Sequence, residues 1–174
     1  MTFLAADIEI LLSGGATNRD PNAALGGAIS TFRPNVGHGR MQGLFRDATA
    51  TELDTPPAVR RIYRCIYIVN TNADDNITLT EVFVQFDTPA ANTSIFIGLD
   101  PVGINGTATT IGAETTLPSG VTFTQPTSYG TGLAIGTLTP GDYTALWIRR
   151  LIGSTGNPSA PDNPFTIRVQ GTIP

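Results

Sequence analysis

Hydrophobic and polar positions alternate with a period of two residues near the start of this chain. Ile8, Ile10 and Leu12 alternate with Asp7 and Glu9, a pattern typical of a strand with one buried face. The sequence therefore predicts a first strand at about residues 5–12.

From residue 60 onward the alternation resumes. Ile62, Ile66 and Ile68 share one face of the first of these strands, and the other face carries Tyr63, Cys65, Tyr67 and Val69. Further strands are predicted at 77–86, 94–99, 107–113, 121–124, 132–136, 143–152 and 165–170, with turn signals between them. No helix-period segment is long enough for a parallel crossover. These features predict an all-β fold, an antiparallel β-sandwich with either an immunoglobulin-like or a jelly-roll strand order.

A long segment rich in Gly, Pro, Asn and Thr, residues 13–58, separates the first strand from the rest. Irregular connections of this length are uncommon in compact domains and are usually functional or disordered. The segment has too few large apolar residues for a core of its own, so we expect an extended Gly-rich N-terminal arm that lies along another protein. The predicted organisation is a single domain, with the first strand in 1–12, the arm in 13–58 and the main β-sandwich in 59–174.

The motif L-x-P-G-x-Y, formed by Leu138, Pro140, Gly141 and Tyr143, precedes the strand at 143–152. It is similar to the tyrosine corner of immunoglobulin-like and fibronectin-type domains, in which the tyrosine hydroxyl returns to nearby backbone. An ordinary Pro-Gly turn before a strand would select the same residues. Both interpretations place Tyr143 at the head of a central strand.

The strand at 143–152 is apolar on both faces, since Ala145 and Trp147 alternate with Leu146 and Ile148. Such a strand needs cover on both sides. The sandwich core supplies one cover, and we expect a neighbouring protein chain to supply the other. Arginines on this strand and on the strand at 60–69 fit the same interpretation, because a planar guanidinium suits interfacial ion pairs.

Composition and charge exclude several classes of protein. The 174 residues include 26 Thr and no Lys, with a formal charge of −4 and a pI of about 4.7, so a phosphate backbone would repel the chain as a whole. No apolar run approaches the roughly 20 residues that cross a bilayer, and residues 1–10 lack the basic region of a secretory signal. We therefore expect neither a nucleic-acid nor a membrane partner.

Residues capable of catalysis are scarce. His38 is the only histidine and lies between glycines within the predicted arm, whereas a general base needs a rigid mount. Cys65 is the only cysteine and is expected to be a buried, unreactive thiol. Asp74 and Asp75 do not have the spacing of a calcium loop. We expect no enzymatic activity, no cofactor and no metal.

Several characteristic stretches are distributed in order along the chain. They are Leu12-Ser13-Gly14-Gly15-Ala16, Asp20-Pro21-Asn22-Ala23, Leu25-Gly26-Gly27-Ala28-Ile29-Ser30, Leu44-Phe45, Tyr63-Arg64-Cys65, Ile97-Gly98-Leu99-Asp100, Gly120-Val121-Thr122-Phe123 and Trp147-Ile148-Arg149-Arg150. Together these stretches resemble small structural proteins of tailed bacteriophage virions. The resemblance implies a repeated, non-enzymatic component of the virion, assembled in the host cytoplasm. It carries over no catalytic residues.

The first hypothesis is a capsid decoration or cement protein that binds the major capsid protein and self-associates. Alternatives are a neck, baseplate or tail-fibre attachment subunit, and a carbohydrate- or cell-surface-binding β-sandwich module, although Trp147 is the only tryptophan and lies in mid-strand. The residues expected at a protein interface are Leu25, Ile29, Phe32, Arg33, His38, Arg40, Phe45, Arg60, Arg61, Arg64, Arg149 and Arg150.

Overall fold

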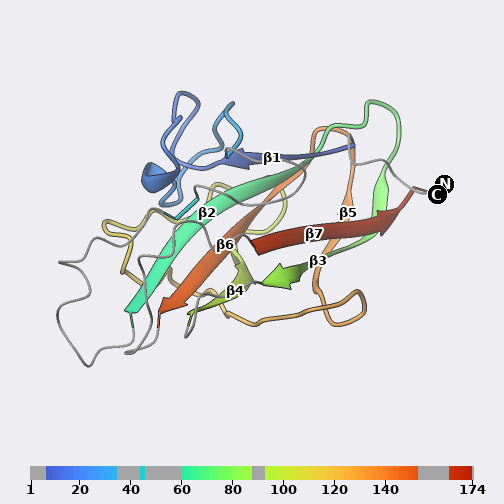
Figure 1. Ribbon diagram of the computed structural model, residues 1–174. Coiled ribbons are helices and arrows are strands. Elements are labelled where there is room, and N and C mark those ends of the chain that lie inside the picture. The colour runs from blue at the N-terminus through green and yellow to red at the C-terminus, as the bar shows by residue number, and fades with distance from the viewer. Residues whose placement is uncertain (1–6, 35–43, 46–59, 88–92, 153–164, 174) are drawn as a thin grey trace.

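The computed structural model describes residues 7–34, 44–45, 60–87, 93–152 and 165–173 (Figure 1). Within these residues the chain forms two antiparallel sheets and one short 3-10 helix, η2(Pro21–Ala23). The all-β, antiparallel prediction is therefore confirmed. Residues 35–43 and 46–58 of the expected arm lie outside the described residues.

The larger sheet has four strands in the order β1-β2-β6-β4. Its members are β1(Ile8–Leu12), β2(Arg60–Asn70), β6(Tyr143–Ile152) and β4(Thr93–Leu99). β2 and β6 pair along nearly their whole lengths, from Arg60 opposite Ile152 to Val69 opposite Tyr143. An immunoglobulin constant-type order would place the fifth strand beside β2, whereas here β6 occupies that place.

The smaller sheet has three strands in the order β5-β3-β7, namely β5(Leu133–Leu138), β3(Ile77–Asp87) and β7(Phe165–Thr172). Both of its pairings contain register irregularities. Pro126 O accepts a hydrogen bond of 2.8 Å from Val84 N, beyond the last residue of β3 that pairs with β5. The loop that precedes β5 thus continues the pairing with β3 beyond Leu133, the first residue of β5.

One hydrophobic cluster draws side chains from both sheets, and we call it the inner cluster. Ile62, Ile66 and Ile68 enter it from β2, as the period-two pattern predicted. Its other strand residues include Leu146, Ile148, Val82, Val84 and Ile167. Leu44 and Phe45 join the same cluster, and the Phe45 ring lies 6.0 Å from the Phe165 ring. The opposite face of the four-stranded sheet, its outer face, is also apolar.

Two predicted strands are wrong. Residues 107–113 and 121–124 form no strand and make only isolated bridges, Gly27 with Ala108 and Ile97 with Thr124. Their Thr and Val content favours extended backbone, but Gly112 interrupts the first stretch, Gly120 immediately precedes the second, and both stretches lie against the sheet instead of forming strands within it.

Asn70 organises the crossing of the chain from one sheet to the other after β2. This fully buried residue donates through Nδ2 to the carbonyls of Leu138 (2.9 Å) and Asp75 (3.1 Å), and its Oδ1 accepts from Asn72 N (3.0 Å). The side chain therefore substitutes for ladder hydrogen bonds that the crossing backbone cannot make.

The tyrosine-corner interpretation is not borne out, and the ordinary turn fits. Asp142 N donates to Thr139 O (2.9 Å), and Gly141 has a φ of +84°. Tyr143 heads β6, but its hydroxyl donates to Asn105 O (3.2 Å), 38 residues away in sequence. The tyrosine fastens a distant loop to the sheet and does not close its own turn.

Candidate interaction surface

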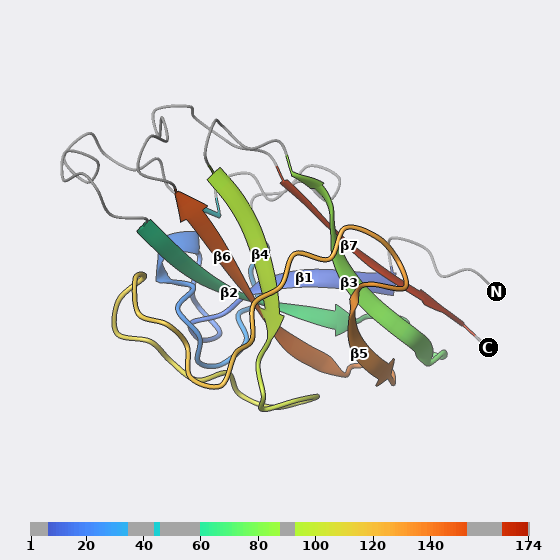
Figure 2. The same cartoon turned by 90° about the horizontal axis from the view of Figure 1, so that it is seen from below.

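Two segments of the chain cover the outer face of the four-stranded sheet. The first is the N-terminal segment, which comprises residues 13–34. The second is the β4–β5 connection, which comprises residues 100–132. Figure 2 shows this connection passing close to β4 on its way to β5. Together with Leu11, Tyr63, Cys65, Tyr67, Ala145 and Trp147 of the sheet they form an outer cluster, to which they contribute Leu25, Ile29, Ala108, Ile111, Val121 and Phe123.

The source of this cover corrects two expectations. The second face of β6 is covered by the chain itself and does not await a neighbouring protein. The described part of the expected arm, residues 13–34, lies on its own sheet. This segment has too few apolar residues to form a core of its own, but it forms a core together with the strands.

Tyr67 holds the two covering segments together. Its hydroxyl donates to Gly27 O (2.6 Å) and accepts from Ala108 N (2.9 Å). Gly26 lies where the segments cross, because a Cβ there would lie 2.0 Å from Thr109 O. Glycine is the residue that permits such a close backbone approach.

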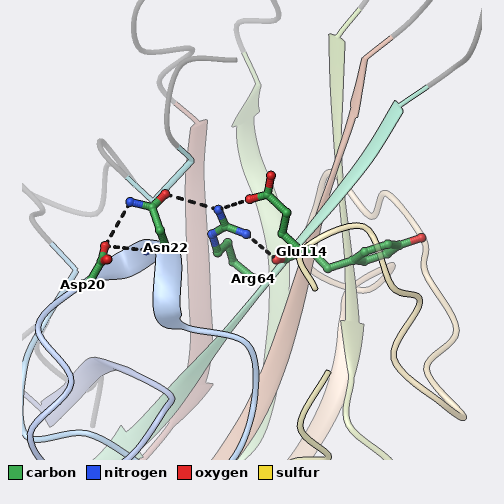
Figure 3. A network of polar contacts seen from close by, with 5 residues as sticks. Asp20, Asn22, Arg64 and Glu114 are labelled. Atoms are coloured by element: carbon green, nitrogen blue, oxygen red, sulfur yellow. Dashed lines mark hydrogen bonds and ion pairs between the residues drawn. The ribbon is translucent and has the colours of Figure 1, made fainter. Parts of the chain in front are cut away.

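Arg64, in the middle of β2, joins the same segments (Figure 3). Its guanidinium donates to Tyr63 O (2.9 Å) and to Asn22 Oδ1 (3.3 Å), and pairs with Glu114 Oε2 (2.5 Å). Asn22 Nδ2 donates in turn to Asp20 (2.9 Å). Only 1% of the Arg64 side chain is exposed. This arginine, which the sequence predicts at a protein interface, here binds the chain's own loops.

Trp147 and Cys65 are both fully buried in the outer cluster. Trp147 Nε1 donates to Asp100 Oδ2 (2.8 Å) at the start of the β4–β5 connection. Burial raises the pKa of the Cys65 thiol far above its ordinary value, which suppresses the thiolate that would react. The expected burial of the thiol is confirmed.

The exposed large hydrophobic side chains of the described residues all lie in the β4–β5 connection. Their exposed fractions are 44% for Val102, 39% for Ile104, 59% for Leu117 and 44% for Tyr129. Sequence reasoning missed all four. One feature of the sequence could have indicated them: each is an apolar residue in a turn-rich stretch, where no period-two pattern predicts that its side chain is buried.

The part of the connection that carries Val102 and Ile104 is firmly attached. Val102 N donates to Asp100 Oδ1 (3.0 Å) and Asn105 N donates to Tyr143 O (2.8 Å). A Cβ at Gly120 would lie 3.0 Å from the Pro101 ring, so the stretch after Leu117 folds back beside the start of the connection. The apolar side chains thus project from a backbone that the sheet holds in place.

Most predicted interface residues of the N-terminal region contact the chain itself. Leu25 and Ile29 are half-buried in the outer cluster, Phe45 is buried, Arg19 stacks over Phe32 at 4.3 Å, and the 69%-exposed side chain of Arg33 pairs with Glu9 at 2.6 Å. His38 and Arg40 lie outside the described residues.

The remaining arginines differ in exposure. Arg150 is buried, with 4% of its surface exposed, and therefore presents little surface to a partner. Arg60 is half-buried and Arg61 is exposed at the start of β2. Arg149 is half-buried on the outer face of β6, and Arg61 and Arg149 remain available to a partner.

Neither a metal cluster nor a membrane-spanning helix is found in the described part of the chain. No three His, Cys, Asp or Glu side chains come together there as a potential metal site. No helix among those residues is long and apolar enough to cross a bilayer.

Comparison with known proteins found no match among family models, curated proteins or solved structures. The proposals that follow therefore rest on this chain's own residues and on the sequence resemblance.

Proposed function

We propose that this protein is a structural component of a tailed bacteriophage virion, and specifically a capsid decoration or cement protein that binds the major capsid protein. The virion assignment rests on the ordered stretches of sequence that resemble small virion proteins. The described structure supports the narrower proposal of a protein-binding role.

The observation that carries this role is the placement of Val102, Ile104, Leu117 and Tyr129 on one anchored connection. Single exposed apolar residues are ordinary on protein surfaces, but the restriction of all four to one connection supports a role for this connection in binding another protein. A rigid backbone lowers the entropy lost on binding. Repeated over a shell, many modest contacts of this kind would give strong overall attachment.

We also infer that the two sheets form a β-sandwich, because the inner cluster takes side chains from both. The sandwich would act as a scaffold that presents the β4–β5 connection. A neck, baseplate or tail-fibre subunit would use the same surface, so position in the particle separates these alternatives. The carbohydrate-binding alternative loses its expected platform, since Trp147 is fully buried.

The test uses particles produced from a phage genome that encodes this chain, with the gene deleted and the protein supplied from a plasmid. We expect the wild-type protein in purified particles, and labelled protein over the head. A variant combining Ile104→Asp and Leu117→Asp should be strongly depleted from particles. Thr137→Asp, at an exposed position of β5, is the matched control and should be incorporated normally.

Absence of the wild-type protein from particles would overturn the virion assignment. Labelled protein at the tail would contradict a capsid decoration role and would favour a neck or baseplate subunit. Normal incorporation of a folded Ile104→Asp, Leu117→Asp protein would show that another surface makes the contact.

A further inference from the structure

Arg149 lies against two aromatic rings on the outer face of the four-stranded sheet. Its Cζ lies 4.1 Å from the centre of the Phe96 ring and 5.1 Å from that of Phe123, which itself lies 5.4 Å from the Tyr63 ring. Arg149 Nε is buried and has no hydrogen-bond partner within the described structure. The rings fix the plane of the guanidinium while the side chain stays partly exposed, which prepares it to bind an acceptor.

Arg61 places a second positive charge beside it. On the paired strands Tyr63 lies opposite Arg149 and Arg61 opposite Leu151, so the two arginines are diagonal neighbours on one face. Loss of hydration and the charge of Arg61 both lower the pKa of Arg149. In the described part of the chain no carboxylate pairs with either arginine, and a carboxylate from outside would relieve their repulsion.

Two carboxylates stand at the other end of β2. Asp74 and Asp75 lie in the turn after this strand, where Asn72 Oδ1 accepts from the backbone N of both (2.9 Å each) and fixes the turn. Asp74 is exposed, and no cation pairs with either carboxylate within the described residues. The 11 residues of β2 separate the two ends by roughly 30 Å, and Figure 2 shows β6 running antiparallel beside β2.

We propose that the Arg61–Arg149 surface of one copy binds the Asp74–Asp75 turn of a second copy. Opposite charges at opposite ends of one rigid strand favour this head-to-tail contact, and a guanidinium fork suits a carboxylate. Because the two surfaces differ, the contact is heterologous and repeats from copy to copy as a closed ring or an open array. This inference goes beyond the proposed function and does not depend on which virion protein the chain binds.

The experiment is sedimentation velocity on the purified full chain at low and high salt. We expect the wild-type protein to form oligomers that increase with concentration at low salt and dissociate at high salt, which screens exposed charges. Variant A combines Arg61→Glu with Arg149→Gln, and variant B combines Asp74→Arg with Asp75→Arg. Each alone should associate on the order of 100-fold more weakly, because like charges then face one another.

Mixing the variants is the decisive measurement. The acidic surface of A complements the basic turn of B, and the unchanged turn of A complements the unchanged arginines of B, so an equimolar mixture should regain oligomers. Arg168→Glu, at an exposed position of β7, is the control and should associate like the wild type. Circular dichroism verifies that each variant is folded, and Arg61→Glu alone serves if variant A is not.

A wild-type protein that stays monomeric throughout the concentration range at low salt would overturn the inference. So would normal association of either folded variant, or a mixture that stays monomeric. The result is independent of the particle experiment, because it requires neither a virion nor the β4–β5 connection.

Discussion

The hydroxyl of Tyr67 satisfies two backbone groups from segments far apart in the sequence, Gly27 O and Ala108 N. Tyr67→Phe leaves both unsatisfied within the outer cluster, and we expect a loss of about 1–2 kcal/mol in the free energy of unfolding. Urea denaturation measures it. Tyr129→Phe, at a 44%-exposed position, is the matched control and should leave stability unchanged. Equal stability of both variants would contradict the bridging role of Tyr67.

The same residue makes stability depend on alkaline pH. Burial, first among its causes, raises the pKa of Tyr67 from 10.0 to about 12. A raised native pKa means that the stabilisation is complete below pH 10 and is lost as pH rises from 10 to 12, because the unfolded chain releases this proton more readily. The wild type should lose more stability than Tyr67→Phe over that window, and parallel curves would rule out this linkage.

Single residues show how far the sequence alone could be interpreted. Period two placed Cys65 in an apolar face, and its burial is confirmed. The same period puts Arg64 between Ile62 and Ile66 on the inner face, so its burial was open to prediction. Its partner Glu114 was not, because an ion pair across 50 residues leaves no local pattern.

At the scale of elements, Gly98 in β4 lets the β4–β5 connection approach the sheet. A Cβ there would lie 2.5 Å from Thr122 O and 2.6 Å from a Val121 methyl. Gly98→Ala should therefore displace the connection and cost about 1–3 kcal/mol. Gly112→Ala is the matched control, since neither glycine has a positive φ and a Cβ at Gly112 meets nothing within 4 Å.

Urea denaturation and hydrogen exchange compare these two variants. In Gly98→Ala we expect faster exchange at Thr124 N, which bonds to Ile97 O (2.9 Å). In Gly112→Ala exchange there should be unchanged. Unaltered stability and exchange in the first variant would show that the connection tolerates displacement.

Strands were predictable where the period-two alternation continued over many residues, as at β2 and β6. There the sequence indicated which side chains lie on each face of the strand. The stretches 107–113 and 121–124 were mistaken for strands because threonine and valine favour extended backbone whether or not it joins a sheet. What covers an outer face is decided by distant backbone contacts such as Ile111 N to Leu25 O (2.9 Å), which no local period encodes.

At the scale of the whole molecule, the four-stranded sheet contributes to two hydrophobic clusters, the inner one shared with the smaller sheet and the outer one shared with the chain's own loops. Trp147, the only tryptophan, is fully buried in the outer cluster and bonds to Asp100. Its fluorescence therefore reports the loop-covered layer, whereas far-UV circular dichroism reports the strands.

We expect the two signals to change together in urea, because Tyr67 and Arg64 couple the loops to β2 and small domains usually unfold in one step. A fluorescence transition at lower urea would mean that the loops detach while the sheets persist. The outer layer would then need a partner chain to hold it closed, as the apolar faces of β6 first suggested, and binding of that partner should restore coincidence of the two transitions.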